Sequence, residues 1–190
     1  MTTCTPSTAI PATTGEPIML EKLRSLVRDI PDYPSEGITF RDITPLLCDP
    51  AGLSLAVEMM VNPFRTMDID IVVGAESRGF IFGTALARAL NAGFVPIRKK
   101  GKLPGDTISQ DYELEYGHDT LEIHRDAIKS GQNVLMVDDL IATGGTLEAG
   151  VKLIKQLGGN LVGISVLIEL EGLDGARLVA PHPVHAVLRY

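Results

Sequence analysis

The stretch that most constrains the fold of this chain is Asn133–Thr146, which reads NVLMVDDLIATGGT. Its apolar run, Val134–Val137, is typical of a strand that is buried on both faces of a parallel sheet. The run ends in two adjacent carboxylates, Asp138 and Asp139, and a glycine loop then leads into the amphipathic run Leu147–Leu157. Because open α/β sheets bind ligands at the carboxyl ends of their strands, this order predicts an α/β fold with a site at this point.

The glycine loop has the chemistry of a phosphate cradle. Gly144 and Gly145 permit a backbone with positive φ and a close approach to a ligand. The N–H groups at the start of the following helix, with the hydroxyls of Thr143 and Thr146, are suitable donors to a phosphate. The carboxylates just upstream are acceptors, which suit the vicinal hydroxyls of a ribose or a metal ion. The segment therefore predicts a ribose 5-phosphate site.

Other phosphate-binding motifs do not fit this loop. A Walker A loop requires a lysine after the glycines, and a dinucleotide fingerprint requires G-x-G-x-x-G. A tight strand-to-helix turn with incidental aspartates remains the structural alternative. The string VDDLIATGGT resembles the ribose-phosphate loop of the type I phosphoribosyltransferases. That resemblance implies that Asp138 and Asp139 hold the ribose hydroxyls of phosphoribosyl pyrophosphate. The residues implied to hold its 5-phosphate are Ala142, Thr143, Gly144, Gly145 and Thr146.

Composition limits the class of protein. With 190 residues, 45% of them hydrophobic and 22% charged, we expect one soluble globular domain and a cytoplasmic location. The two cysteines, Cys4 and Cys48, have no metal-binding spacing, which disfavours both a disulfide and a zinc site. The net charge of −7 argues against general binding to nucleic acid or a membrane surface.

Most of the expected elements follow from periodicity. Residues 1–18 are expected to form a disordered extension, and residues 19–190 the domain. The expected helices are Met19–Ile30, Leu53–Phe64, Ile81–Leu90, 119–129 and Leu147–Leu157. Besides the central strand, the expected strands are Ile69–Val73, Ala92–Ile97, Leu161–Leu170 and Ala186–Leu188.

The segment Tyr33–Pro45, YPSEGITFRDITP, is patterned too strongly for a spacer. On its own it predicts an ordered loop with an exposed aromatic side chain. It resembles the base-binding loop of the adenine phosphoribosyltransferase family. The resemblance implies that the backbone near Thr39 and Arg41 meets the purine edge and that Phe40 meets its face; we assign Leu140 to the same adenine site.

A polar turn, Gly74–Phe80, follows another predicted strand and reads GAESRGF. From the residues alone, a capped helix start explains it equally well. In the family that the chain resembles, the equivalent turn holds the pyrophosphate, often through a cis peptide bond. Here that bond would join Glu76 and Ser77, and Arg78 would neutralise the diphosphate.

The basic run after the next strand contains Arg98, Lys99, Lys100 and Lys102, and by composition alone it could be a solvated turn. It follows a predicted parallel strand, however, and so should emerge at the same sheet edge as the Ser-Arg-Gly turn. The string RKKGKLPG also resembles the adenine-specific family. We therefore predict a polyanion clamp in which Arg98, Lys99 and Lys102 bind pyrophosphate.

The segment Thr107–Gly117 alternates tyrosine and glutamate, which on its own is compatible with a plain hairpin. Its LEYG string resembles the mobile hood of the same family. The resemblance assigns Tyr112, Glu115 and Tyr116 to a hood loop, with Glu115 as the candidate acid or base for adenine and Arg78 as the second catalytic residue.

The resemblance covers about residues 19–190 and places its strings in the family's order. It implies the type I phosphoribosyltransferase fold, a central, mostly parallel sheet flanked by helices with a small hood. It also implies a homodimer that converts adenine and phosphoribosyl pyrophosphate to AMP and pyrophosphate in purine salvage, with Mg²⁺ carried by the pyrophosphate and no metal held directly by the protein. The alternatives are a transferase for hypoxanthine, guanine or a pyrimidine, and a ligand-sensing regulator of nucleotide genes, which would need a nucleic-acid-binding module or a basic face.

Overall fold

The computed structural model describes residues 16–113 and 118–190. The chain divides into two compact units, an N-terminal unit that ends at Gly52 and a C-terminal unit, Leu53–Tyr190. In the part of the chain that is described, no helix is long and apolar enough to cross a membrane.

The N-terminal unit contains α1 (Glu16–Ser25), β1 (Arg28–Ile30), β2 (Phe40–Asp42) and α2 (Thr44–Cys48). The predicted helix Met19–Ile30 is therefore wrong in its last part, since the helix ends at Ser25. Strand β1 pairs antiparallel with β2, so that Asp29 stands opposite Arg41. Ion pairs reinforce this ribbon, because Arg28 Nε donates to Asp42 Oδ2 at 3.0 Å and Arg41 pairs with Asp29. Pairing with a strand more distant in sequence outweighs the local helical pattern here.

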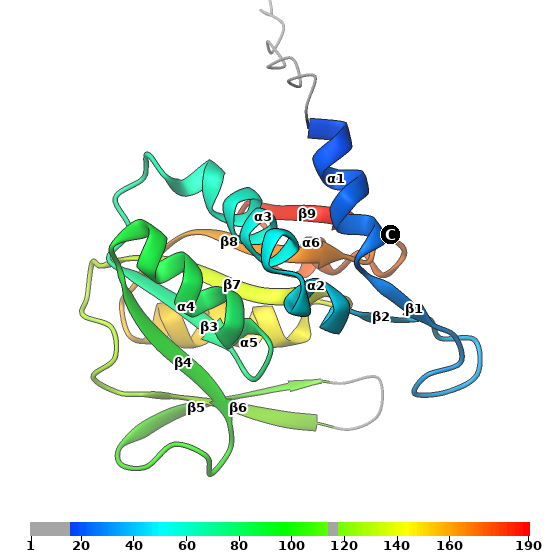
Figure 1. Cartoon of the computed structure of the whole chain (residues 1–190). Coiled ribbons are helices and arrows are strands. Elements are labelled where there is room, and N and C mark those ends of the chain that lie inside the picture. Colours follow the sequence, from blue (N-terminus) through cyan, green and yellow to red (C-terminus); the bar gives the residue numbers. More distant parts are fainter. Residues whose placement is uncertain (1–15, 114–117) are drawn as a thin grey trace, which may run out of the picture. The chain divides into compact units, whose positions relative to one another are not determined.

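The described part of the C-terminal unit is built on a seven-stranded sheet with the order β5-β6-β4-β3-β7-β8-β9 (Figure 1). Strands β4, β3, β7, β8 and β9 run parallel, and the antiparallel pair β5–β6 extends the edge beyond β4. The strands are β3 (Ile71–Ala75), β4 (Gly93–Lys99), β5 (Thr107–Glu113), β6 (His118–His124), β7 (Asn133–Ile141), β8 (Asn160–Glu169) and β9 (Val184–Arg189). The sheet is thus mostly parallel, as predicted.

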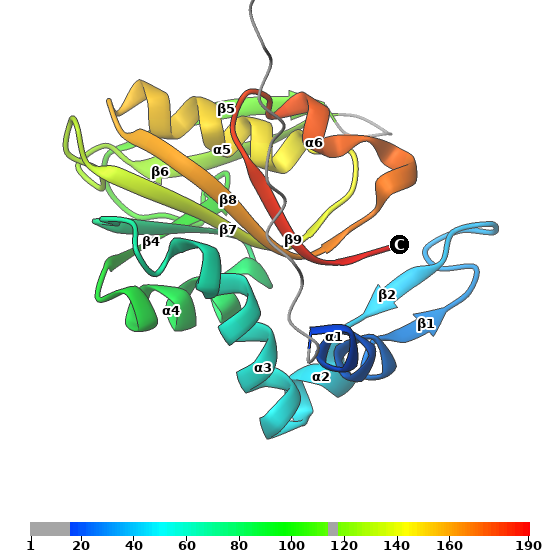
Figure 2. The same ribbon diagram turned by 90° about the horizontal axis from the view of Figure 1, so that it is seen from above.

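Helices cover both faces of this sheet, and Figure 2 shows α4 and α5 on opposite sides of it. Helix α5 buries Leu147, Leu153 and Ile154 in the main hydrophobic core. Helix α4 approaches the other face closely, since a Cβ on Gly83 would lie 2.7 Å from Cε2 of Phe94. The helices are α3 (Pro50–Val61), η1 (Asn62–Phe64), α4 (Gly79–Leu90), α5 (Gly145–Gln156), η2 (Glu171–Leu173) and α6 (Gly175–Leu178).

The prediction of a helix over residues 119–129 is wrong, because this stretch begins with strand β6. Leu121 and Ile123 alternate along the strand and are both buried in the core. Their spacing of two residues is the strand period, which the helical interpretation overlooked. Strand β6 pairs with β5 along its whole length, so Thr107–Glu113 forms one strand of a hairpin whose second strand is the stretch expected to be helical.

Candidate active site

A pocket of about 340 Å³ opens at the carboxyl ends of β3 and β7. Three segments of the C-terminal unit line it: the turn after β3, the side chain of Tyr112 in β5, and the end of β7 with the start of α5. The lining residues are Glu76, Ser77, Arg78, Tyr112, Asp138, Asp139, Leu140, Ile141, Ala142, Thr143, Gly144, Gly145, Thr146 and Leu147. The structure thus places the ribose-phosphate segment and the Ser-Arg-Gly turn around one pocket.

The acidic pair lies inside β7, which continues to Ile141 beyond the predicted strand end. Asp138 and Asp139 are each only 7% exposed. The Asp139 N–H donates to Asp138 Oδ1 at 2.8 Å, and the Asp139 carboxylate forms an ion pair with Arg78, with 2.7 Å between Oδ2 and Nε. Burial, reinforced by the neighbouring charge of Asp139, raises the pKa of the Asp138 carboxyl well above its ordinary value. The pair therefore combines one shielded carboxyl with one that is paired to a cation.

The glycine loop begins α5 with Gly144 at φ +88°, in the left-handed region that the sequence predicted. The loop packs against the first residue of α6. A Cβ on Gly144 would lie 2.5 Å from the Gly175 carbonyl oxygen, and a Cβ on Gly175 would lie 2.1 Å from the Ala142 carbonyl oxygen. Gly175 was not among the predicted site residues, since nothing in its local sequence indicates that it supports a loop more than 30 positions earlier.

The turn after β3 has the predicted cis peptide bond between Glu76 and Ser77. This turn also packs on the acidic pair, because a Cβ on Gly79 would lie 2.8 Å from Asp138 Oδ1. Gly79 therefore allows the first turn of α4 to approach β7 closely, which brings Arg78 within reach of Asp139.

The basic run is held by Glu76. The carboxylate of Glu76 accepts hydrogen bonds from the Lys99 backbone N–H at 2.9 Å and from Arg98 Nε at 3.3 Å, and it also pairs with Lys102. Burial opposes ionisation, but the hydrogen bonds from Lys102 and from the Lys99 backbone lower the pKa of Glu76 below its ordinary value. The predicted convergence of the basic run and the Ser-Arg-Gly turn is thus present. Among the described residues of this cluster, Glu76 lines the pocket, whereas Arg98, Lys99 and Lys102 are not among the lining residues.

Tyr112 contributes to the pocket from β5 and is 8% exposed. Burial raises the pKa of its phenol above the ordinary value. Its hydroxyl donates to Asp119 Oδ2 over 3.4 Å, and the same oxygen lies 2.9 Å from Lys99 Nζ. Asp119 was not predicted, since its range was interpreted as helical. Glu115 and Tyr116 lie outside the described residues.

The predicted base-binding residues belong to different units. Thr39, Phe40 and Arg41 belong to the N-terminal unit, where Phe40 and Arg41 form part of β2. The ring of Phe40 packs edge-on against that of Tyr33, with 5.3 Å between their centroids. Leu140 belongs to the C-terminal unit and lines the pocket.

A glycine cradle at a helix N-terminus, two carboxylates and a cationic turn around one pocket suit a sugar phosphate that carries a second anionic group. The parallel sheet and this site define a phosphoribosyltransferase. Residues 47–181 match the family model described as the phosphoribosyl transferase domain. The chain belongs to this family.

Similar proteins agree with this assignment over nearly the whole chain. The chain is 57% identical over 179 residues to an adenine phosphoribosyltransferase from Rhodopirellula baltica. The aligned region covers 94% of this chain and 87% of the relative. The crystal structure of adenine phosphoribosyltransferase from Rhodothermus marinus has a TM-score of 0.87 at 54% identity, covering 92% of this chain and 99% of that one. The Saccharomyces cerevisiae enzyme, solved with an imino-altritol bisphosphate and adenine, has a TM-score of 0.86 at 41% identity, covering 90% of this chain and 99% of that one.

Proposed function

We propose that this chain catalyses the transfer of the phosphoribosyl group from phosphoribosyl pyrophosphate to adenine, which yields AMP and pyrophosphate. The observation that carries the proposal is the single pocket shared by the glycine cradle, the acidic pair and Arg78. The base is assigned from relatives named adenine phosphoribosyltransferase, which include one that is 57% identical. The reaction is a pentosyl transfer of purine salvage.

The ribose-phosphate part of the substrate is assigned to the segment that follows β7. The backbone N–H groups and hydroxyls of 142–146 would hold the 5-phosphate at the N-terminus of α5, where the helix dipole favours an anion. Asp138 and Asp139 would accept hydrogen bonds from the ribose hydroxyls. Their rigid place in β7 would fix the sugar relative to the diphosphate.

The leaving group is assigned to the cationic turn and the basic run. Breaking the bond from C1 of the ribose to pyrophosphate leaves positive charge on the sugar and negative charge on the diphosphate. Ser77 would donate to the diphosphate, and the catalytic Arg78 would neutralise it together with Arg98, Lys99 and Lys102. Glu76 would contribute by positioning the cations that it contacts, because its own carboxylate would repel the phosphates.

The base is assigned to Thr39, Phe40 and Arg41 together with Leu140. The backbone would read the purine edge, and Phe40 would stack on its face. Adenine must lose its N9 proton or gain one at N7, and Glu115 is the proposed acid or base for this transfer. Tyr112 and Tyr116 are proposed to flank it in the hood.

We propose that magnesium enters the site bound to the diphosphate of the substrate. Its oxygen ligands would come from the substrate phosphates and from water, with none from the protein, since Asp138 and Asp139 are assigned to the ribose hydroxyls. When bound, the ion would neutralise charge on the leaving pyrophosphate. The protein residues would bind and orient the sugar and the diphosphate around it.

We also propose a homodimer that works in the cytoplasm, with residues 19–190 as the catalytic domain and residues 1–18 as an extension. Light scattering coupled to size-exclusion chromatography tests the assembly, and a mass of one chain would contradict the dimer.

The reaction is tested with purified protein, adenine, phosphoribosyl pyrophosphate and magnesium. AMP and pyrophosphate should form in equal amounts, and chelation of the metal should stop their formation. Absence of AMP under these conditions would contradict the proposed function.

A further inference from the structure

We propose that Asp119 is a positioning residue, which holds the ammonium group of Lys99 beside the pocket so that it is ready to meet the diphosphate. The inference rests on the proposed function, in which Lys99 binds that group. Asp119 lies in β6, directly opposite Tyr112 of β5 in the register of the hairpin.

One carboxylate oxygen of Asp119 contacts both Lys99 and Tyr112. Asp119 Oδ2 lies 2.9 Å from Lys99 Nζ and 3.4 Å from the hydroxyl of Tyr112, and Tyr112 lines the pocket. The other oxygen, Oδ1, accepts the Thr120 backbone N–H at 2.8 Å, which orients the carboxylate. Lys99 is therefore linked, through one carboxylate oxygen, to a residue that lines the pocket.

The charges of the two groups support each other. The hydrogen bond from Lys99 lowers the pKa of Asp119, and the same contact raises the pKa of Lys99, so both stay ionised around neutral pH. The Lys99 side chain is 52% exposed and that of Asp119 is 23% exposed. A pair this open to water contributes little to the stability of the fold, so the protein should remain folded when the pair is removed.

The main chain of the basic run is anchored without Asp119. The Lys100 N–H donates to the Thr120 carbonyl at 3.1 Å, and the Gly101 N–H donates to Glu122 Oε2 at 2.9 Å. Glu76 holds the Lys99 N–H from the other side. Loss of the Asp119 charge would therefore release the Lys99 ammonium group and leave the loop in place.

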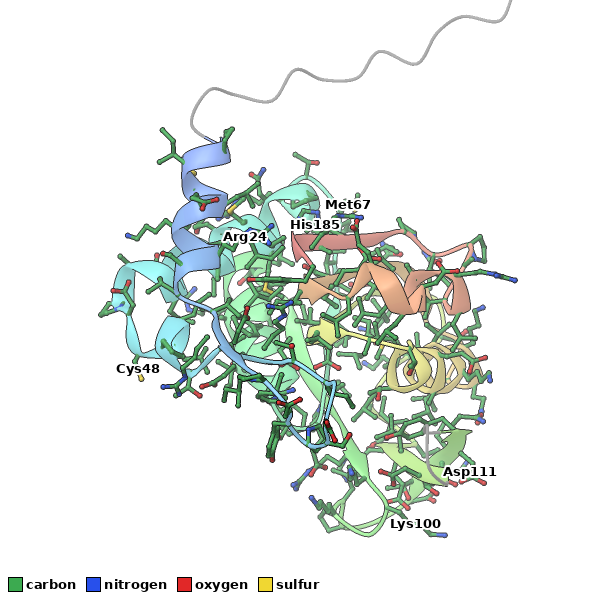
Figure 3. The ribbon with its side chains drawn as sticks, turned by 90° about the vertical axis from the view of Figure 1, so that its right-hand side faces the viewer. Arg24, Cys48, Met67, Lys100, Asp111 and His185 are labelled. Carbon is green, nitrogen blue, oxygen red and sulfur yellow. The ribbon has the colours of Figure 1, made fainter. Side chains whose placement is uncertain are left out.

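The hairpin supplies matched controls. Asp111 carries the same charge in β5, but its Oδ1 accepts the hydroxyl of Thr120 at 2.7 Å. Lys100 neighbours Lys99, and with the described residues it makes no ion pair. Figure 3 shows Lys100 and Asp111 in the region of the hairpin, with exposed side chains. Asp111→Asn and Lys100→Met thus make the same changes of charge away from the proposed contact.

The test measures the binding of pyrophosphate with magnesium to the full chain by calorimetry. Asp119→Asn should weaken binding about two- to fivefold, the size expected for a partly exposed ion pair. It should also raise the KM for phosphoribosyl pyrophosphate more than it lowers kcat. Asp111→Asn should bind like the unaltered protein. In a Lys99→Met background, adding Asp119→Asn should have no further effect, while Lys100→Met should leave the effect of Asp119→Asn intact.

Tighter or unchanged binding in Asp119→Asn would overturn the proposal, as would an equal loss in the Lys99→Met background. If Asp119→Asn did not fold, as judged by its melting curve, the carboxylate would be structural and the proposal would be wrong. Lys99→Met alone must also weaken pyrophosphate binding. Failure of the proposed function is recognised separately, because it would show as absence of AMP formation by the unaltered protein.

Discussion

The two carboxyls of the acidic pair are neighbours in sequence but differ in their electrostatic surroundings. Both are buried, but Asp139 forms an ion pair with Arg78, whereas burial and the charge of Asp139 raise the pKa of Asp138. A buried carboxyl destabilises the fold when it is charged, unless nearby cations and hydrogen-bond donors replace the water that it loses. The presence of the Asp138 carboxyl in the wall of the pocket, despite this destabilisation, fits a role in ligand binding.

Replacing Asp138 should weaken substrate binding. Asp138→Asn should lower the affinity for phosphoribosyl pyrophosphate by about 1.5–3 kcal/mol, the usual size for a hydrogen bond to a charged group. Calorimetry or the KM for this substrate measures the change. Unaltered affinity in both Asp138→Asn and Asp139→Asn would remove the assignment to ribose.

The same replacement should stabilise the protein. The pKa of Asp138 is higher in the folded chain than the ordinary 3.8, so the folded state binds its proton more tightly than the unfolded state does. The resulting destabilisation is absent below 3.8 and complete above the raised folded value. Asp138→Asn should therefore raise the melting temperature at mildly alkaline pH, and the gain should shrink as the pH falls. A gain independent of pH would contradict this explanation.

The lysines of the basic run are expected to differ in their roles. Lys102 contacts Glu76 next to the pocket, and it should act on the leaving diphosphate. Lys102→Ala should lower turnover by about 10²-fold, the size typical of losing one fixed donor in a transition state. AMP binding should hardly change, because AMP has no pyrophosphate. The control is Lys100→Ala, and an equal loss of AMP affinity and turnover in Lys102→Ala would place Lys102 at the monophosphate instead.

At the level of elements, the glycine loop proposed to bind phosphate packs closely against α6. A Cβ on Gly175 would lie 2.1 Å from the Ala142 carbonyl oxygen, so Gly175→Ala must displace either the loop or the helix. Affinity for AMP should fall at least about tenfold, because a cradle of N–H groups requires precise placement. Gly172 lies in the same connection, and a Cβ added there would meet no atom within 4 Å, so Gly172→Ala is the matched control. Equal AMP affinity in the two variants would show that the loop does not need this support.

The apolar strands of the sheet could be predicted from the sequence, and so could the short edge strand β9, whereas β1 and β6 could not. The apolar runs of β3, β7 and β8 identify them as core strands, and their parallel order follows from the intervening helices. Strand β6 was taken for a helix because its charged residues hide the alternation of Leu121 and Ile123. Strand β1 depends on a partner that lies beyond the loop after Ile30. Its pairing is a property of the folded ribbon and leaves little local signal.

The same distinction applies to the site. The acidic pair and its glycine loop form a motif that is continuous in sequence, and the structure places both parts around one pocket. Gly175 and Asp119 were missed because each acts on a segment that only the fold brings to it. The predicted contact of Glu76 with pyrophosphate was inferred from its place in the turn; the structure shows its carboxylate among the cations of the basic run.

For the whole molecule, the central claim is that one active site selects adenine. Adenine offers a donor at N6 and an acceptor at N1, whereas hypoxanthine offers an acceptor at O6 and a donor at N1. In the proposed site, a backbone carbonyl and an N–H near Thr39 and Arg41 would read the base, and such a pair can match only one of these patterns. A site that must leave two buried polar groups unpaired with the wrong base rejects it by roughly 10⁴–10⁵-fold.

The most direct test is a competition between the two bases. Purified protein is given magnesium, phosphoribosyl pyrophosphate and equal concentrations of adenine and hypoxanthine, and the nucleotides are separated and quantified. We predict that AMP forms and that IMP stays below about one part in 10³ of it, a conservative bound on that discrimination. Comparable amounts of IMP and AMP would contradict the claim that this enzyme selects adenine.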